Sequence, residues 1–119
     1  MDIPSVFRLA KNVSKYSDHR FKIGAVLMKH GKVISVGYNQ TKSHPEAWHT
    51  GLHAEIKAIK TSGKIEMSNS TMVVYREHKN GTPATAKPCK HCAKAMKDFG
   101  IKTIWYTTSE FPFWKRIKL

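Results

Sequence analysis

The sequence predicts a three-layer α/β/α sandwich built around a mixed sheet of four to five strands. Apolar residues recur along the chain either at helical spacing or in short, nearly continuous runs typical of buried strands. Segments of these two kinds alternate, which favours a sheet covered by helices on both faces. A chain of 119 residues can build one hydrophobic core but not two, so a single domain is expected over residues 1–119.

The N-terminal third is expected to hold one helix and two strands. Asp2 can cap a helix that carries Pro4 in its first turn, where a missing N–H is harmless. An apolar stripe at spacings of three and four marks the buried side of this helix: Val6, Leu9, Ala10, Val13 and Tyr16. Strands are predicted over 22–29 and 32–38, with His30-Gly31 as a tight hairpin turn between them. Their nearly continuous apolar runs favour strands that are covered on both faces.

The rest of the chain alternates between loops, helices and strands. Apolar periodicity, β-branched content and Gly or Pro boundaries predict, in order, a polar loop over 39–52, a helix over 53–63, a strand over 71–76, a loop over 77–87, a helix over 88–100 and a strand over 102–107. The last two strands flank a helix long enough to cross the sheet, so they are expected to run parallel.

The charge of the chain is strongly positive. Its 21 Lys and Arg residues outnumber 8 Asp and Glu residues, which gives a net charge of +13. Such an excess favours phosphate-bearing partners or substrates, with a lysine-rich surface that only aids solubility as the alternative. The sequence lacks an apolar run long enough to span a membrane, and its start lacks the form of a signal peptide. A cytoplasmic protein with no membrane partner is therefore expected.

Two short motifs concentrate the residues that can bind a metal. The first is His53-Ala54-Glu55, and the second is Pro88-Cys89-Lys90-His91-Cys92, which contains both cysteines of the chain. One imidazole and two thiolates are ligands that Zn²⁺ prefers, and three protein ligands leave the fourth position open for water, as in catalytic sites. Glu55 follows the histidine by two residues, close enough to act on that water without binding the metal.

Both motifs lie where a helix is expected to begin. Free N–H groups and roughly half a positive charge at a helix start lower the pKa of nearby thiols and stabilise anionic ligands. Cys89 and Cys92 are three residues apart, so both side chains should project from one face toward one ion. This spacing argues for metal or redox chemistry and against a structural disulfide.

His-x-Glu followed by Pro-Cys-x-x-Cys is the signature of zinc-dependent nucleobase deaminases. Over roughly residues 20 to 107 the chain resembles the cytidine/deoxycytidylate deaminase superfamily. The resemblance implies a cytidine deaminase-like fold and one zinc ion per chain, held by His53, Cys89 and Cys92. It also implies that Glu55 carries protons in a hydrolytic deamination that releases ammonia. The expected parallel strand pair suggests the branch of deoxycytidylate and tRNA deaminases, rather than the branch with an antiparallel ending.

The resemblance also implies contacts to the substrate. Asn39, in Gly37-Tyr38-Asn39, matches an asparagine that binds the nucleoside, although asparagine also suits a turn for its own sake. The backbone N–H of Ala54 and the residue Pro88 complete the expected base contacts. In the place of a phosphate-binding loop the chain has three residues that could hold a phosphate or simply lie on the surface: Lys42, Ser43 and His44.

The expected substrate is the cytosine base of a free nucleoside or nucleotide. The resemblance also implies that the protein forms a homo-oligomer. One alternative is a deaminase of cytosine or adenine in single-stranded DNA or RNA, including tRNA. The segment 111–116 combines aromatic and basic residues, which suits stacking of bases as well as a subunit interface. A remote alternative is a non-catalytic, closed zinc site in a nucleic-acid-binding protein, in which His49 joins His53 and the cysteines.

Overall fold

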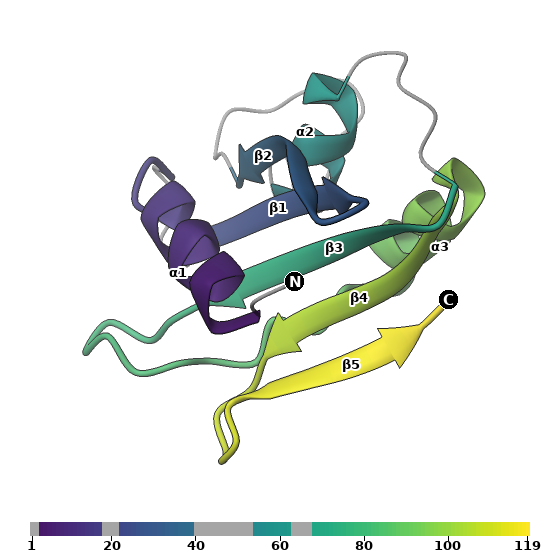
Figure 1. The fold of residues 1–119 in the computed structure, drawn as a ribbon. Coiled ribbons are helices and arrows are strands. Elements are labelled where there is room, and N and C mark those ends of the chain that lie inside the picture. The colour runs from purple at the N-terminus through teal and green to yellow at the C-terminus, as the bar shows by residue number, and fades with distance from the viewer. Residues whose placement is uncertain (1–2, 18–21, 40–53, 63–67) are drawn as a thin grey trace.

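A computed structural model of the protein describes residues 3–17, 22–39, 54–62 and 68–119 (Figure 1). These residues form three helices and five strands in the order α1 (Ile3–Ser14), β1 (Ile23–Lys29), β2 (Lys32–Tyr38), α2 (Ala54–Thr61), β3 (Ser70–Arg76), α3 (Lys90–Phe99), β4 (Ile101–Thr107) and β5 (Trp114–Lys118). The strands make one sheet in the order β2-β1-β3-β4-β5. One face of the sheet carries α1 and the other carries α2 and α3, which confirms the three-layer sandwich.

The sheet is mixed. β1 pairs antiparallel with both β2 and β3, and β3 pairs parallel with β4 across the crossover made by α3. The parallel pair was predicted from the length of the intervening helix and is confirmed. Among the described elements, none is a helix long and apolar enough to cross a membrane.

The C-terminal end of the sheet differs from the prediction. β5 pairs antiparallel with β4, with Trp105 opposite Arg116, so the expectation of a branch without an antiparallel ending is wrong. Six residues, 108–113, separate the two strands, too few for a crossover helix but enough for a hairpin. The segment 111–116 is therefore not a free tail, because part of it belongs to the sheet.

The β1–β2 hairpin has the turn that its sequence predicts. His30 and Gly31 have φ values of 54° and 74°, and positive φ at both central residues is typical of the tight turns that join such strands. The central residues of β1 are buried on both faces, as predicted. β2 lies at the edge of the sheet and is only partly buried, so the prediction of two covered faces fails for this strand.

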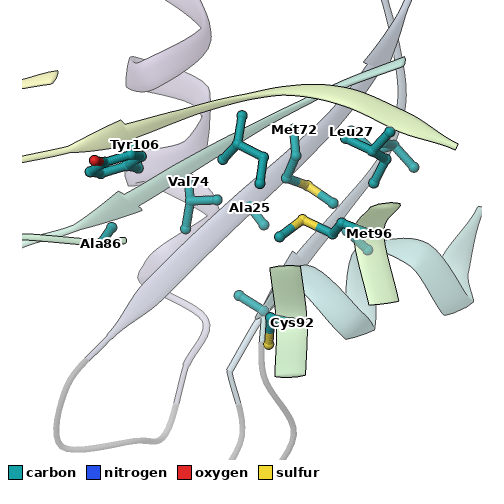
Figure 2. Close-up of a cluster of buried hydrophobic side chains, with 12 residues drawn as sticks. Ala25, Leu27, Met72, Val74, Ala86, Cys92, Met96 and Tyr106 are labelled. Atoms are coloured by element: carbon teal, nitrogen blue, oxygen red, sulfur yellow. The ribbon is translucent and has the colours of Figure 1, made fainter. Parts of the chain in front are cut away.

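The core has one cluster on each face of the sheet. Figure 2 shows the larger cluster, between the sheet and helices α2 and α3: Ala25, Leu27, Met72, Val74, Ala86, Cys92, Met96 and Tyr106, with others. The smaller cluster joins α1 to the opposite face: Val6, Phe7, Ala10, Val26, Met28, Val73 and Tyr75. Tyr16 was expected on the buried stripe but lies beyond the end of α1 and is 76% exposed.

Two glycines let helices approach the sheet closely. A Cβ atom at Gly24 would collide with the backbone of α1 at Ala10, and one at Gly37 would collide with the backbone of α2 at Ala54 and Ala58. Glycine at these positions therefore fixes the distance of α1 and α2 from their strands. The approach at Gly37 sets the position of the first residue of α2.

Candidate active site

The first turn of α2 forms one wall of the candidate site. Ala54 is fully buried and Glu55 is 5% exposed, so this helix begins inside the molecule. Besides the close approach at Gly37, the Ser35 hydroxyl donates a 2.6 Å hydrogen bond to the carbonyl of Ala58. These two contacts hold α2 against β2 and thereby position the glutamate.

The first turn of α3 forms the opposing wall. Cys89 is the N-cap residue, and the N–H of Cys92 donates a 3.4 Å hydrogen bond to its sulfur. Cys89 is exposed, whereas Cys92 is fully buried, and neither cysteine forms a disulfide. The helix ends at Gly100, whose left-handed φ of 101° lets its N–H bond back to the last carbonyls. Both cysteines therefore share one helix start, as predicted.

Glu55, at the start of α2, lies close enough to Cys92, at the start of α3, for its charge to affect the Cys92 thiol. Burial raises the pKa of the Glu55 carboxyl, because the charged form loses water. Burial also raises the pKa of the Cys92 thiol, with a further contribution from the charge of Glu55. The sequence predicted that the helix start would lower the pKa of this thiol. For Cys92 this prediction fails, because burial and the nearby carboxylate oppose the helix start.

This arrangement fits a bound divalent cation. Two cysteine sulfurs at one helix start, not joined as a disulfide, are soft donors of the kind that zinc takes. A cation bound beside the two sulfurs would stabilise the thiolate form of Cys92 and so offset the free-energy cost of burying its charge. Within the described ranges there is no group of three or more metal-binding side chains. The third predicted ligand, His53, directly precedes α2 in the sequence and lies outside the described residues.

Asn39 is buried at the end of β2, 7% exposed, and its side chain is already engaged. Its Oδ1 accepts a 2.9 Å hydrogen bond from the Ile23 N–H and a 2.7 Å hydrogen bond from the Ser17 hydroxyl. The same hydroxyl also lies 2.7 Å from the Asn39 carbonyl oxygen. The two hydrogen bonds to Oδ1 occupy both of its lone pairs. Ser17 was missed by the sequence analysis, since a serine beyond a helix end carries no periodic signal.

Backbone and side-chain hydrogen bonds hold the loop between β3 and α3 in place. Glu77 and Pro83 form an isolated antiparallel bridge, and Asn80-Gly81 makes the turn between them. The chain then passes the end of β4, where the Thr107 hydroxyl donates to the carbonyl of Ala84 at 2.7 Å and the N–H of Ala86 donates to the carbonyl of Thr107 at 2.9 Å. These bonds deliver the chain to the start of α3.

The other predicted site residues fall into two groups. Pro88 is half-buried just before the N-cap of α3, and His91, which lies between the two cysteines of the motif, is exposed. The predicted phosphate contacts Lys42, Ser43 and His44, and the alternative ligand His49, lie outside the described residues.

The fold and the site together define a class of protein. An α/β/α sandwich that sets a buried glutamate at one helix start beside paired cysteines at another has the form of the nucleobase deaminases. The family described as "Cytidine and deoxycytidylate deaminase zinc-binding region" matches residues 2–108. The chain belongs to this family, and its fold is cytidine deaminase-like.

Three similar proteins illustrate the breadth of the family. The chain is 28% identical over 106 residues to the riboflavin biosynthesis protein RibD of Aquifex aeolicus, a match covering 84% of this chain and 25% of that protein. It is 30% identical over 97 residues to a tRNA-specific adenosine deaminase of Rickettsia bellii, covering 80% and 61%. The chain thus spans about a quarter of the first relative and about three-fifths of the second.

A cytidine deaminase from Burkholderia pseudomallei has a similar structure, with a TM-score of 0.77, 19% identity and coverage of 99% of this chain and 93% of that chain. The match extends over nearly the whole chain, and at this identity it shows the fold. The family match supports a deaminase, and the names of the relatives differ, so they do not single out one base.

Proposed function

We propose that the protein is a zinc-dependent hydrolytic deaminase that acts on the cytosine base of a free nucleoside or nucleotide. The observation that carries this proposal is the pairing of buried Glu55 with Cys92 across the starts of α2 and α3, in a chain of the deaminase family. Residues 1–119 act in this proposal as a single deaminase domain.

The metal ligands in this proposal are His53, Cys89 and Cys92. When bound, zinc supplies Lewis-acid chemistry and makes water a better nucleophile near neutral pH. The ligand role of Cys89 is supported by its position as the N-cap of α3, and that of Cys92 by its position one turn further on at the same helix start.

Glu55 carries the protons in the proposed reaction. A carboxyl whose pKa is raised by burial can both accept and donate a proton near neutral pH. It takes a proton from water and passes it to the ring nitrogen next to the attacked carbon. It then takes the second proton of that water from the hydroxyl now on the carbon, and passes it to the leaving amine. Water and the amino base are consumed, and ammonia and the uracil product are formed.

Asn39 and the backbone N–H of Ala54 are proposed to orient the base. Two hydrogen bonds to Oδ1 fix the side chain of Asn39, and the buried start of α2 limits access of bulk water. Lys42, Ser43 and His44 are proposed to hold a phosphate. The net charge of +13 suits a substrate that carries phosphate.

A second candidate is deamination of cytosine or adenine within single-stranded nucleic acid. The observation that favours it is the 30% identity to a tRNA-specific adenosine deaminase, which exceeds the identity to the RibD relative. The same positive charge suits a polynucleotide as well as a nucleotide.

Ammonia release tests both candidates. The zinc-loaded protein is incubated with cytidine, deoxycytidine, their monophosphates, single-stranded DNA and a tRNA anticodon hairpin, each with and without a chelator. We expect activity on a monomer that chelator abolishes and added zinc restores. Activity on an oligonucleotide alone, falling steeply with salt, would replace the first candidate by the second. Activity that survives complete zinc removal would refute the zinc-dependent reaction.

A further inference from the structure

The face of the sheet opposite the candidate active site carries a surface of aromatic and basic residues. This surface, the β4–β5 face, comprises Trp105, Trp114, Arg116 and Lys118. Trp105 lies directly opposite Arg116, Thr107 opposite Trp114, and Thr103 opposite Lys118. Side chains of such cross-strand partners project from the same side of a sheet. Trp105 packs against the α1 cluster, so the whole row faces the α1 side.

This face is open along its outer strand. α1 packs on β1, β2 and β3, and among the described elements the only one in close backbone contact with β5 is β4. Figure 1 shows α1 beside the left ends of β1 and β3, with β4 and β5 farther across the sheet. Trp114 remains 36% exposed, and Arg116 and Lys118 are exposed. The surface can therefore be reached from solvent.

The aromatic rings are held in fixed orientations. The ring of Trp114 stacks on that of Phe7, with centroids 5.8 Å apart and planes at 17°. Phe7 is buried at 6% exposure, so it supports the indole of Trp114, which is itself 36% exposed. On the next pair of residues along the ladder, the guanidinium of Arg116 lies 5.5 Å from the ring centroid of Trp105. A rigid aromatic platform beside cations is the combination that binds unpaired bases and their phosphates.

The charges around this face select the kind of partner. α1, β4 and β5 contain no Asp or Glu, and on this side of the sheet α1 and β5 contribute four basic residues: Arg8, Lys11, Arg116 and Lys118. A second copy of this chain would bring the same positive charge against it, which disfavours self-association through this face. A polyanion with stackable bases is attracted on both counts.

We propose that the β4–β5 face binds single-stranded nucleic acid, with bases stacked on Trp114 and phosphates contacting Arg116 and Lys118. The site lies on the opposite side of the sheet from Glu55 and Cys92, so it is separate from the proposed catalytic site. Binding here does not require that the bound strand be deaminated.

Binding of fluorescein-labelled oligo(dT) to the full chain tests this proposal. Thymine has no exocyclic amine, so the probe cannot be deaminated and the result is independent of the proposed enzymatic function. We expect fluorescence anisotropy to report binding that weakens with salt, and tryptophan fluorescence to be quenched. Duplex DNA of the same length should bind more weakly, because its bases are not available for stacking.

Variants then locate the binding. Trp114→Ala should weaken oligo(dT) binding roughly 5- to 150-fold, the loss of about one stacked base, and Trp114→Tyr should restore most of it. Arg116→Ala combined with Lys118→Ala should lower the salt slope by about 1.4, because each lost phosphate contact removes about 0.7. The matched control replaces two exposed lysines of α3, Lys94 and Lys97, by Ala and should leave the slope nearly unchanged.

Three results would overturn the proposal. They are equal affinity for duplex and single strand, an equal loss of affinity in the α3 control, and oligo(dT) binding undiminished in a correctly folded Trp114→Ala protein. The remaining alternative is that this face binds a second copy of the chain, which sedimentation of the protein without DNA tests. A dimer that the double variant at Arg116 and Lys118 abolishes would assign the face to that second copy. If Trp114→Ala unfolds, the double variant at Arg116 and Lys118 decides the question alone.

Discussion

Replacing Glu55 by Gln should abolish turnover and leave the fold and the metal site intact. The side chain is 5% exposed, and the substitution exchanges one carboxylate oxygen for an amide nitrogen with little change in volume. Because burial raises the pKa of Glu55, the surroundings already favour an uncharged side chain at this position. The variant therefore loses a proton carrier without gaining a cavity or an uncompensated charge.

The expected loss of activity is large. Removing one general acid–base group costs roughly 10²–10⁴-fold in rate, which corresponds to about 2.7–5.4 kcal/mol of transition-state stabilisation. Glu55 is assigned to several proton transfers in one reaction, so we expect a loss at the upper end of this range. Glu55→Asp is the matched control, because it keeps the carboxyl group and withdraws it by one methylene. Its activity should lie between that of the wild type and that of Glu55→Gln.

Three measurements check this prediction on the same preparations. Ammonia release gives the rate with the best substrate, metal analysis gives the zinc content per chain, and thermal denaturation gives the stability. The reasoning is refuted if Glu55→Gln turns over at close to the wild-type rate. It is refuted as well if the variant loses its zinc, because Glu55 would then be a ligand rather than a proton carrier.

The remaining predictions concern four other positions. Ser17→Ala should lower the free energy of unfolding by about 1 kcal/mol. By loosening the carboxamide of Asn39 it should also raise KM more than it lowers kcat. A fall in kcat with KM unchanged would contradict a role in substrate positioning. Gly37→Ala should destabilise the protein by about 1–3 kcal/mol, measured by urea unfolding, because the new methyl group collides with the backbone of α2; an unchanged midpoint would argue against this close approach. Cys92→Ala should lose both its zinc and its activity, measured by metal analysis and by ammonia release. Retained zinc would exclude this cysteine as a ligand. Burial raises the pKa of Tyr75, assisted by its hydrogen bond to a nearby carboxylate, so an ultraviolet titration should show one tyrosine that ionises well above the ordinary value of about 10. Since the folded-state pKa is the higher one, the stabilisation from this side chain is complete below pH about 10 and is lost as the pH rises further; Tyr75→Phe should remove both effects, and a titration unchanged in that variant would assign the late ionisation elsewhere.

Much of the fold follows from local pattern in the sequence. The His30-Gly31 turn was predictable because tight hairpins need two residues with positive φ, and both have it. The parallel pairing of β3 and β4 was predictable because a helix, the ten-residue α3, connects the two strands and makes a crossover. The start of α3 at Lys90, directly after its N-cap Cys89, was predictable to within two residues because proline suits the first turn of a helix and an apolar stripe at helical spacing follows.

The errors arose where tertiary contacts decide the outcome. β5 escaped prediction because Trp-Lys-Arg-Ile-Lys buries only Ile117 in part, so its pairing with β4 leaves little apolar alternation in the sequence. Tyr16 fits the helical stripe but lies beyond Ser14, where the helix has ended. Its neighbour Ser17 is 3% exposed because its hydroxyl finds Asn39, which lies 22 residues away in the sequence. Such long-range hydrogen bonds leave no periodic trace.

The sulfur of Cys89 has two roles, and selection for stability or for activity can separate them. It caps α3 by accepting the N–H of Cys92, and it is one of the proposed metal donors. Sulfur is a weak acceptor, and Ser, Asp or Asn caps a helix more strongly. A library randomised at position 89 and sorted for thermal resistance alone should therefore drift toward oxygen-bearing side chains. The same library sorted for ammonia release should return cysteine. The difference in residue frequencies at position 89 between the two selected pools would then measure how far metal binding, rather than folding, requires cysteine there.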